Sequence, residues 1–98
     1  MANHFGSLFY IRHEDENQIK RLANAIRNKS KIDEIWDIQF KTICVEYVRI
    51  VTYEDSDPNR IVLKFEFRRH LPFALIETLE DSGFKLLVHI TAVRLGTE

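Results

Sequence analysis

The chain has 98 residues and a mass of 11.6 kDa, which fits one domain built around one packed core. Its 14 Lys and Arg against 15 Asp and Glu give a net charge of −1, so bulk electrostatics favours neither nucleic acid nor an anionic membrane. Hydrophobic residues make up 45% of the chain, with only 3 Gly and 2 Pro, which excludes collagenous, disordered and low-complexity classes.

The single cysteine, Cys44, has no partner for an internal disulfide or a cysteine-based metal site, which favours a reducing compartment. No apolar run approaches the roughly 20 residues that a membrane helix needs, and residues 1–5 lack the pattern of a signal peptide. We therefore expect a cytoplasmic protein of one domain, residues 1–98, without membrane association.

The first predicted elements are a short strand at residues 8–12 and a helix at residues 16–28. Asp15 suits the N-cap, and Gln18 three residues later completes a capping-box pattern. Apolar residues then recur at helical spacing, namely Ile19, Leu22, Ala23 and Ile26. His13 beside Glu14 and Asp15 could form an acid/base group, but capping explains the two acids, and His13 is interpreted as a solvated histidine.

Residues 32–40 fit either a helical turn or a strand, and both interpretations stay open. A long strand is predicted over residues 43–53. We assign one face of this strand to the core and the other to the free side of the sheet. The inward set is Ile43, Val45, Tyr47, Arg49, Val51 and Tyr53; the outward set is Cys44, Glu46, Val48, Ile50 and Thr52.

The acidic and polar residues 54–59 predict a turn, and the alternating residues 61–68 predict the second strand of a hairpin. Pro72 suits the first turn of a second helix, which ends before Gly83 as its C′ residue. A last strand follows over residues 84–93. The expected buried stripe of the second helix is Leu71, Phe73, Leu75, Ile76 and Leu79.

The element order is therefore β-α-β-β-α-β, which resembles the ferredoxin-like, split βαβ arrangement. The predicted fold class is α+β, with a four-stranded, mainly antiparallel sheet and two helices on one face. Because this architecture hosts many unrelated functions, function is argued from sites.

The uncovered sheet face is the first candidate site. Apolar residues on the second strand, together with aromatic and charged residues on the outer strands, predict a surface that binds a partner protein. The alternative is that a bulge or residues 32–40 cover this surface. The candidate partner-binding residues are Tyr10, Val48, Ile50, Leu87 and His89.

A basic cluster, Arg68, Arg69 and His70, directly precedes the second helix. Arginine forks near a helix N-terminus suit a phosphate or carboxylate, so this cluster is a candidate anion-binding site; the alternative is that its charges are solvated or paired with Glu66 or Glu77. Lys64 and Arg12 extend it toward a nucleic-acid or polyanion surface. Recognition of RNA bases lacks support, because the third strand places no aromatic residues on its outer side.

Catalytic and metal-binding patterns are absent from the sequence. Asp55, Asp57, Asn59 and Glu66 imitate the ligand spacing of an EF-hand, but Arg60 replaces the required glycine and the flanks alternate like strands. The four histidines have no zinc-ligand spacing, and no phosphate loop or nucleophile motif occurs. We therefore expect no catalytic residues, no metal and no cofactor.

The sequence thus favours a small, non-enzymatic interaction or regulatory module. It would act through protein–protein contacts of its free sheet face or an edge strand, with a homodimer as the expected assembly. Binding of RNA, DNA or another polyanion through the basic cluster is the alternative. A small-ligand sensor or an enzyme using the helix entrance near His70 is the third.

Overall fold

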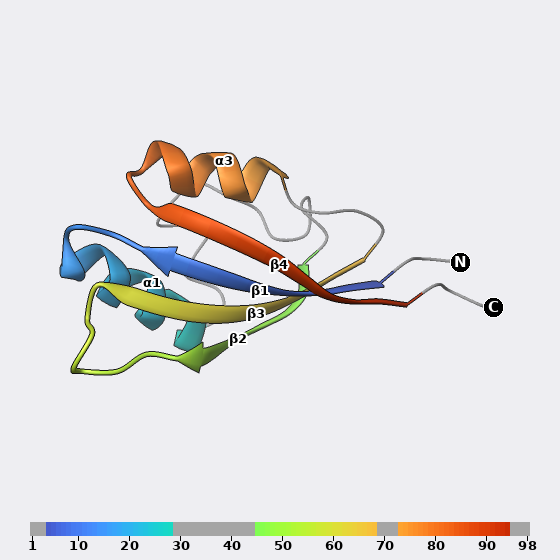
Figure 1. Cartoon of the computed structure of the whole chain (residues 1–98), viewed down its shortest axis with the longest axis horizontal. Helices are drawn as coiled ribbons and strands as arrows, with labels where there is room; N and C mark the ends of the chain where they lie inside the picture. Colours follow the sequence, from blue (N-terminus) through green and yellow to red (C-terminus); the bar gives the residue numbers. More distant parts are fainter. Residues whose placement is uncertain (1–3, 29–44, 69–72, 95–98) are drawn as a thin grey trace.

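Four strands and two helices form the described part of the chain (Figure 1). The computed structural model describes residues 4–28, 45–68 and 73–94. The elements are β1 (His4–Arg12), α1 (Glu16–Asn28), β2 (Val45–Thr52), β3 (Arg60–Arg68), α3 (Phe73–Asp81) and β4 (Lys85–Arg94). The order β-α-β-β-α-β and its antiparallel sheet confirm the predicted ferredoxin-like fold class.

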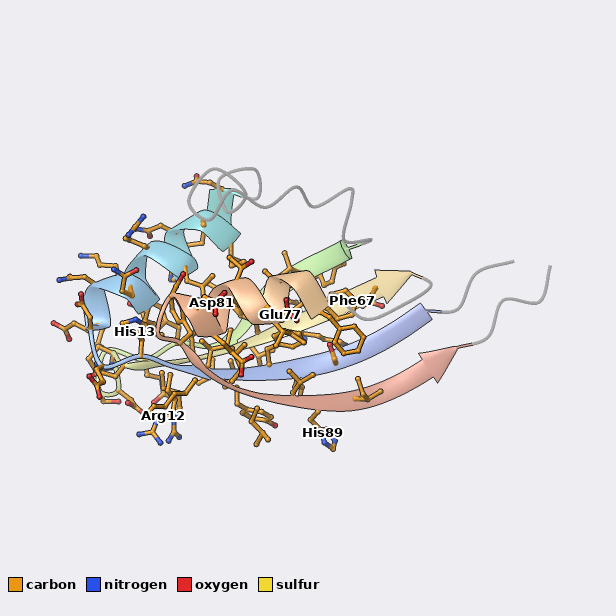
Figure 2. The ribbon with its side chains drawn as sticks, turned by 90° about the horizontal axis from the view of Figure 1, so that it is seen from above. Arg12, His13, Phe67, Glu77, Asp81 and His89 are labelled. Carbon is orange, nitrogen blue, oxygen red and sulfur yellow. The ribbon has the colours of Figure 1, made fainter. Side chains whose placement is uncertain are left out.

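The sheet has the strand order β2-β3-β1-β4, and every neighbouring pair is antiparallel. The two central strands are β1 and β3, which come from opposite halves of the chain. Both helices lie on one side of the sheet (Figure 2). The opposite side is the surface to which the candidate site belongs.

The core lies between the sheet and the helices. Phe9 of β1 lies 4.6 Å from Phe65 and 6.0 Å from Phe67, measured between ring centroids, so three phenylalanines form its centre. Helix α1 contributes Ile19 and Leu22, which are fully buried. The predicted inward faces of β3 and α1 are therefore confirmed. The other buried members are Ile11, Ala23, Ala25, Ile26, Ile61, Leu63, Leu75, Leu79 and Phe84.

Helix α1 spans the predicted residues 16–28, and Asp15 caps it: its Oδ1 accepts a hydrogen bond from the Asn17 amide at 2.9 Å. The capping box is not completed by Gln18. Instead, the Asp15 amide donates to Nδ1 of His13 at 2.9 Å. The histidine therefore takes the acceptor role that the sequence pattern assigns to the glutamine.

Helix α3 ends in a Schellman motif, as the position of Gly83 predicts. Gly83 has a φ of 91°, its amide donates to the Glu80 carbonyl, and the Phe84 amide donates to the Leu79 carbonyl. Leu75 and Leu79 are buried as expected. Phe73, the first residue of the helix, is not buried: it is 64% exposed. Leu71 and Pro72 lie outside the described residues.

The predicted facing of β2 is wrong. Val48 pairs with Phe65 and Ile50 with Leu63, and both side chains pack against the core from the helix side of the sheet. Tyr47, by contrast, is 44% exposed. Register shifts interrupt the β2–β3 ladder at two places, so a simple alternation along the sequence does not describe this strand. Cys44 and residues 32–40 lie outside the described residues.

Within residues 4–28, 45–68 and 73–94, no helix combines the length and apolarity that crossing a membrane requires.

Candidate functional site

The candidate site is the side of the sheet that faces away from the helices, called the free face below. Figure 2 shows Arg12 and His89 on this side and Phe67 on the helix side. Strand alternation and the sheet register define which other residues share it. The described side chains of the free face are Leu8, Tyr10, Arg12, Tyr47, Arg49, Thr52, Arg60, Val62, Lys64, Glu66, Lys85, Leu87 and His89.

An apolar strip crosses three strands of the free face. Tyr10 of β1 is the register partner of both Leu87 on β4 and Val62 on β3, and Leu8 lies two residues before it on β1. Leu87 is 68% exposed and Tyr10 is 39% exposed. Exposed apolar side chains that adjoin each other across strands are typical of a surface that a partner covers.

A second feature of the free face is its charge. Among the described side chains it carries five cations and one carboxylate, Glu66. Three of the cations form one cross-strand row at the end of the sheet, because Arg12 pairs in register with both Arg60 and Lys85. We call these three the basic row. The other two cations are Arg49 and Lys64, which are register partners on β2 and β3.

A shallow groove of about 520 Å³ adjoins the basic row. Arg12 and Lys85 line it from the sheet, and the neighbouring loops provide its remaining walls. The lining residues are Arg12, His13, Glu14, Asp57, Asn59 and Lys85.

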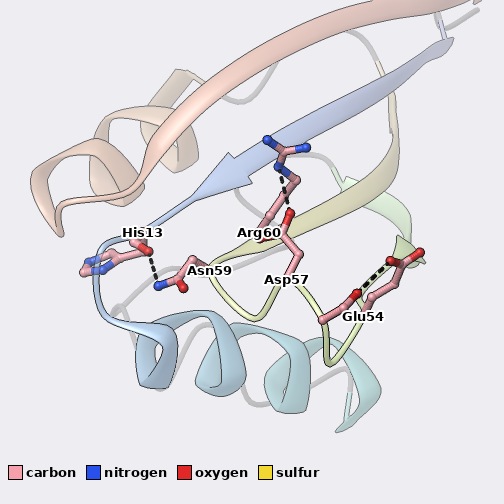
Figure 3. Close-up of polar contacts among 6 residues, drawn as sticks. His13, Glu54, Asp57, Asn59 and Arg60 are labelled. Carbon is pink, nitrogen blue, oxygen red and sulfur yellow. Dashed lines mark hydrogen bonds and ion pairs between the residues drawn. The ribbon is translucent and has the colours of Figure 1, made fainter.

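Hydrogen bonds join the loops around this groove. The His13 amide donates to the Asn59 carbonyl at 3.1 Å, and Asn59 Nδ2 donates to the carbonyl oxygens of His13 and Glu14, each at 3.0 Å (Figure 3). Asp57 pairs with Arg60, with 3.6 Å between Oδ2 and Nε. The β1–α1 connection and the β2–β3 hairpin are thus fixed to each other at the groove.

Three of the five predicted partner-binding residues come together on the free face. Tyr10 and Leu87 are register partners, and His89 pairs with Leu8 in the next position along the same two strands. The other two, Val48 and Ile50, lie on the opposite side of the sheet, so their assignment to this surface is wrong.

The predicted anion-binding cluster falls at the edge of what the structure describes. Arg68 is the last residue of β3, whereas Arg69 and His70 lie outside the described residues. The basic row and its groove are a different cationic site. The three residues of the basic row are distant in sequence. They come together only because β1 lies between β3 and β4 in the sheet.

The EF-hand-like residues do not converge on one point. Asp57 pairs with Arg60, the Asn59 amide holds the β1–α1 connection, and Glu66 lies within β3. In the described ranges there is no group of three or more His, Cys, Asp or Glu side chains arranged to hold a metal ion.

The fold and the free face define an α+β domain of the ferredoxin-like class, with a sheet whose one side is covered by helices. No protein-family model matches the sequence, and no curated protein matches it. Among solved structures, it is similar to a dimeric ferredoxin-like protein from an uncultured marine organism. The TM-score is 0.53, and the likeness covers 98% of this chain and 99% of that one. At 14% identity, this likeness establishes the fold.

Proposed function

We propose that this protein is a non-enzymatic interaction module that forms a homodimer through its free face. The observation that carries the proposal is the apolar strip, in which Leu87 and Tyr10 stay exposed side by side. The similar solved structure is described as dimeric, which supports self-association in this fold. Because a twofold interface uses the same patch on both copies, the strip of one protomer would cover the strip of the other.

The size of the free face is compatible with this assembly. Four strands spaced about 4.8 Å apart give the face a width of about 19 Å, and about nine residues of about 3.3 Å each give it a length of about 30 Å. The area of the face is therefore about 570 Å². Two copies packed face to face over this whole outline would bury about 1,100 Å², slightly more than the roughly 1,000 Å² that specific interfaces exceed. The surplus of cations opposes the association, so we expect a modest affinity.

Sedimentation equilibrium from 1 µM to 1 mM tests the proposal, with these limits chosen to span micromolar to millimolar dissociation constants. The wild-type chain should pass from monomer to dimer within this interval. Leu87→Asp combined with Tyr10→Asp should remain monomeric, because four carboxylates would have to be buried in the apolar strip.

Phe73→Asp is the matched control for these two substitutions. Phe73 is similarly exposed but belongs to α3, on the other side of the sheet, so this variant should dimerise like the wild type. A wild-type chain that stays monomeric throughout would refute the proposal. A dimer that survives both aspartates would also refute it and would direct attention to pairing through the edge strands β2 and β4.

Polyanion binding is a second candidate function, favoured by the five cations on the free face. A fluorescently labelled single-stranded RNA, followed by anisotropy, tests it. Binding should weaken steeply between 50 and 200 mM salt, and weaken again in Arg49→Gln with Lys64→Gln. Binding that is absent, or that does not depend on salt, would remove this candidate.

A further inference from the structure

The basic row places like charges directly opposite each other on adjacent strands. Arg12 is the register partner of Arg60 on one side and of Lys85 on the other. Directly opposed like charges destabilise a sheet. An anion that binds between such side chains removes this cost.

Only one of the three cations is countered by a carboxylate among the described residues. Asp57 lies 3.6 Å from Arg60, whereas no described carboxylate lies within 4 Å of the Arg12 or Lys85 charge. These two side chains line the groove of about 520 Å³. Small-molecule sites range from about 300 to 1,000 Å³, so the groove has room for a small ligand.

Hydrogen bonds of Asn59 hold the loop residues of the groove, His13 and Glu14, in place. Its side chain binds the carbonyl oxygens of His13 and Glu14, and its own carbonyl accepts from the His13 amide. The same histidine is fixed at the ring, since Nε2 lies 3.0 Å from the Ser82 carbonyl oxygen. The loops that flank the two cations are therefore preorganised, which lowers the entropy cost of binding.

We propose that Arg12 and Lys85 bind a small phosphate-bearing molecule in this groove. An arginine fork donates two parallel hydrogen bonds to phosphoryl oxygens, and a lysine adds a second positive charge beside it. Two cations match the charge of about −2 on a phosphate monoester at neutral pH. Two carboxylates also line the groove: Glu14, which opposes an anion, and Asp57, which is paired with Arg60. The proposal concerns the monomer, because Arg12 and Lys85 belong to the free face that the proposed dimer covers.

The test is titration calorimetry of the full chain with inorganic phosphate and pyrophosphate, at an ionic strength held constant with sodium chloride. Arg12→Ala combined with Lys85→Ala should weaken binding about tenfold or more, the loss expected when charge-assisted hydrogen bonds are removed. Glu14→Gln should tighten binding, because it removes the opposing charge. In amide NMR spectra, Arg12 and Lys85 should show the largest shifts.

Lys20→Ala combined with Arg21→Ala is the matched control. It removes the same two charges from the exposed side of α1 and should leave binding unchanged. The proposal is refuted if the wild-type chain binds neither probe at millimolar concentration, or if the control weakens binding as much as the groove variant does. It is also refuted if only an RNA oligonucleotide binds, because the ligand would then be a polymer on the whole free face.

Discussion

At the scale of single residues, the His13 ring connects the start of α1 to the turn between α3 and β4. Its Nδ1 accepts from the Asp15 amide, so Nε2 carries the proton and donates to the Ser82 carbonyl oxygen. The ring also lies edge-on to Phe84, with 4.7 Å between centroids. The interpretation of His13 as solvated is therefore wrong. Its partner Ser82 is 69 positions away, and no local pattern reveals such a contact.

Gly83 is the residue whose substitution measures this connection. Its φ of 91° disfavours any side chain, and an added Cβ would lie 3.0 Å from Nε2 of His13. Gly83→Ala should therefore lower the free energy of unfolding by about 1–2 kcal/mol, or more if the ring shifts. Urea denaturation followed by circular dichroism measures this change.

The His13→Ala background separates the two causes of this loss. There the crowding at Nε2 is gone and the backbone strain remains, so Gly83→Ala should cost less than it does in the wild type. Equal costs in both backgrounds would show that the histidine contact has no part in the effect.

At the scale of elements, the sequence predicts best those segments in which one face is clearly more apolar than the other. β3 alternates fully buried residues such as Leu63 and Phe65 with charged ones, and its facing is predicted correctly. β2 has apolar residues on both faces, since Tyr47 lies on the opposite side from Val48 and Ile50. A shift of the register by one residue moves every side chain of such a strand to the other face of the sheet. Only the pairing with β3 decides which face is buried.

The corrected facing of β2 predicts opposite outcomes for two neighbouring substitutions. Val48→Asp should lower the free energy of unfolding by about 3 kcal/mol or more, because it places an unpaired carboxylate against the core. Tyr47→Asp should change it by less than about 1 kcal/mol, since that side chain is already 44% exposed. Urea denaturation of both variants checks the assignment, and a larger loss for Tyr47→Asp would contradict it.

At the scale of the whole molecule, a net charge of −1 conceals a separation of charge. The free face carries a surplus of cations, whereas α3 exposes Glu77, Glu80 and Asp81. Figure 2 shows Glu77 and Asp81 on this helix. The fold class follows from the order of predicted elements, but the basic row requires β1 to lie between β3 and β4. The net charge therefore predicts no overall attraction to polyanions, while the strand order gathers cations on one face of the sheet.

This separation of charge gives the proposed dimer a distinctive salt dependence. Face-to-face packing brings together two surfaces that each carry five described cations and one described carboxylate. Because salt screens this repulsion, raising sodium chloride from about 20 mM to 500 mM should lower the dimer dissociation constant several-fold in sedimentation equilibrium. Polyanion binding to the same surface changes in the opposite direction.

Arg49→Gln combined with Lys64→Gln tests whether these cations cause the effect. Both lie within the free face as register partners, so their neutralisation should strengthen the dimer at low salt and flatten its salt dependence. Lys20→Gln combined with Arg21→Gln removes the same charge from α1 and should leave the slope as it is in the wild type. If salt weakens the wild-type dimer instead, attraction between opposite charges holds the two copies together, and packing through the cationic free face is excluded.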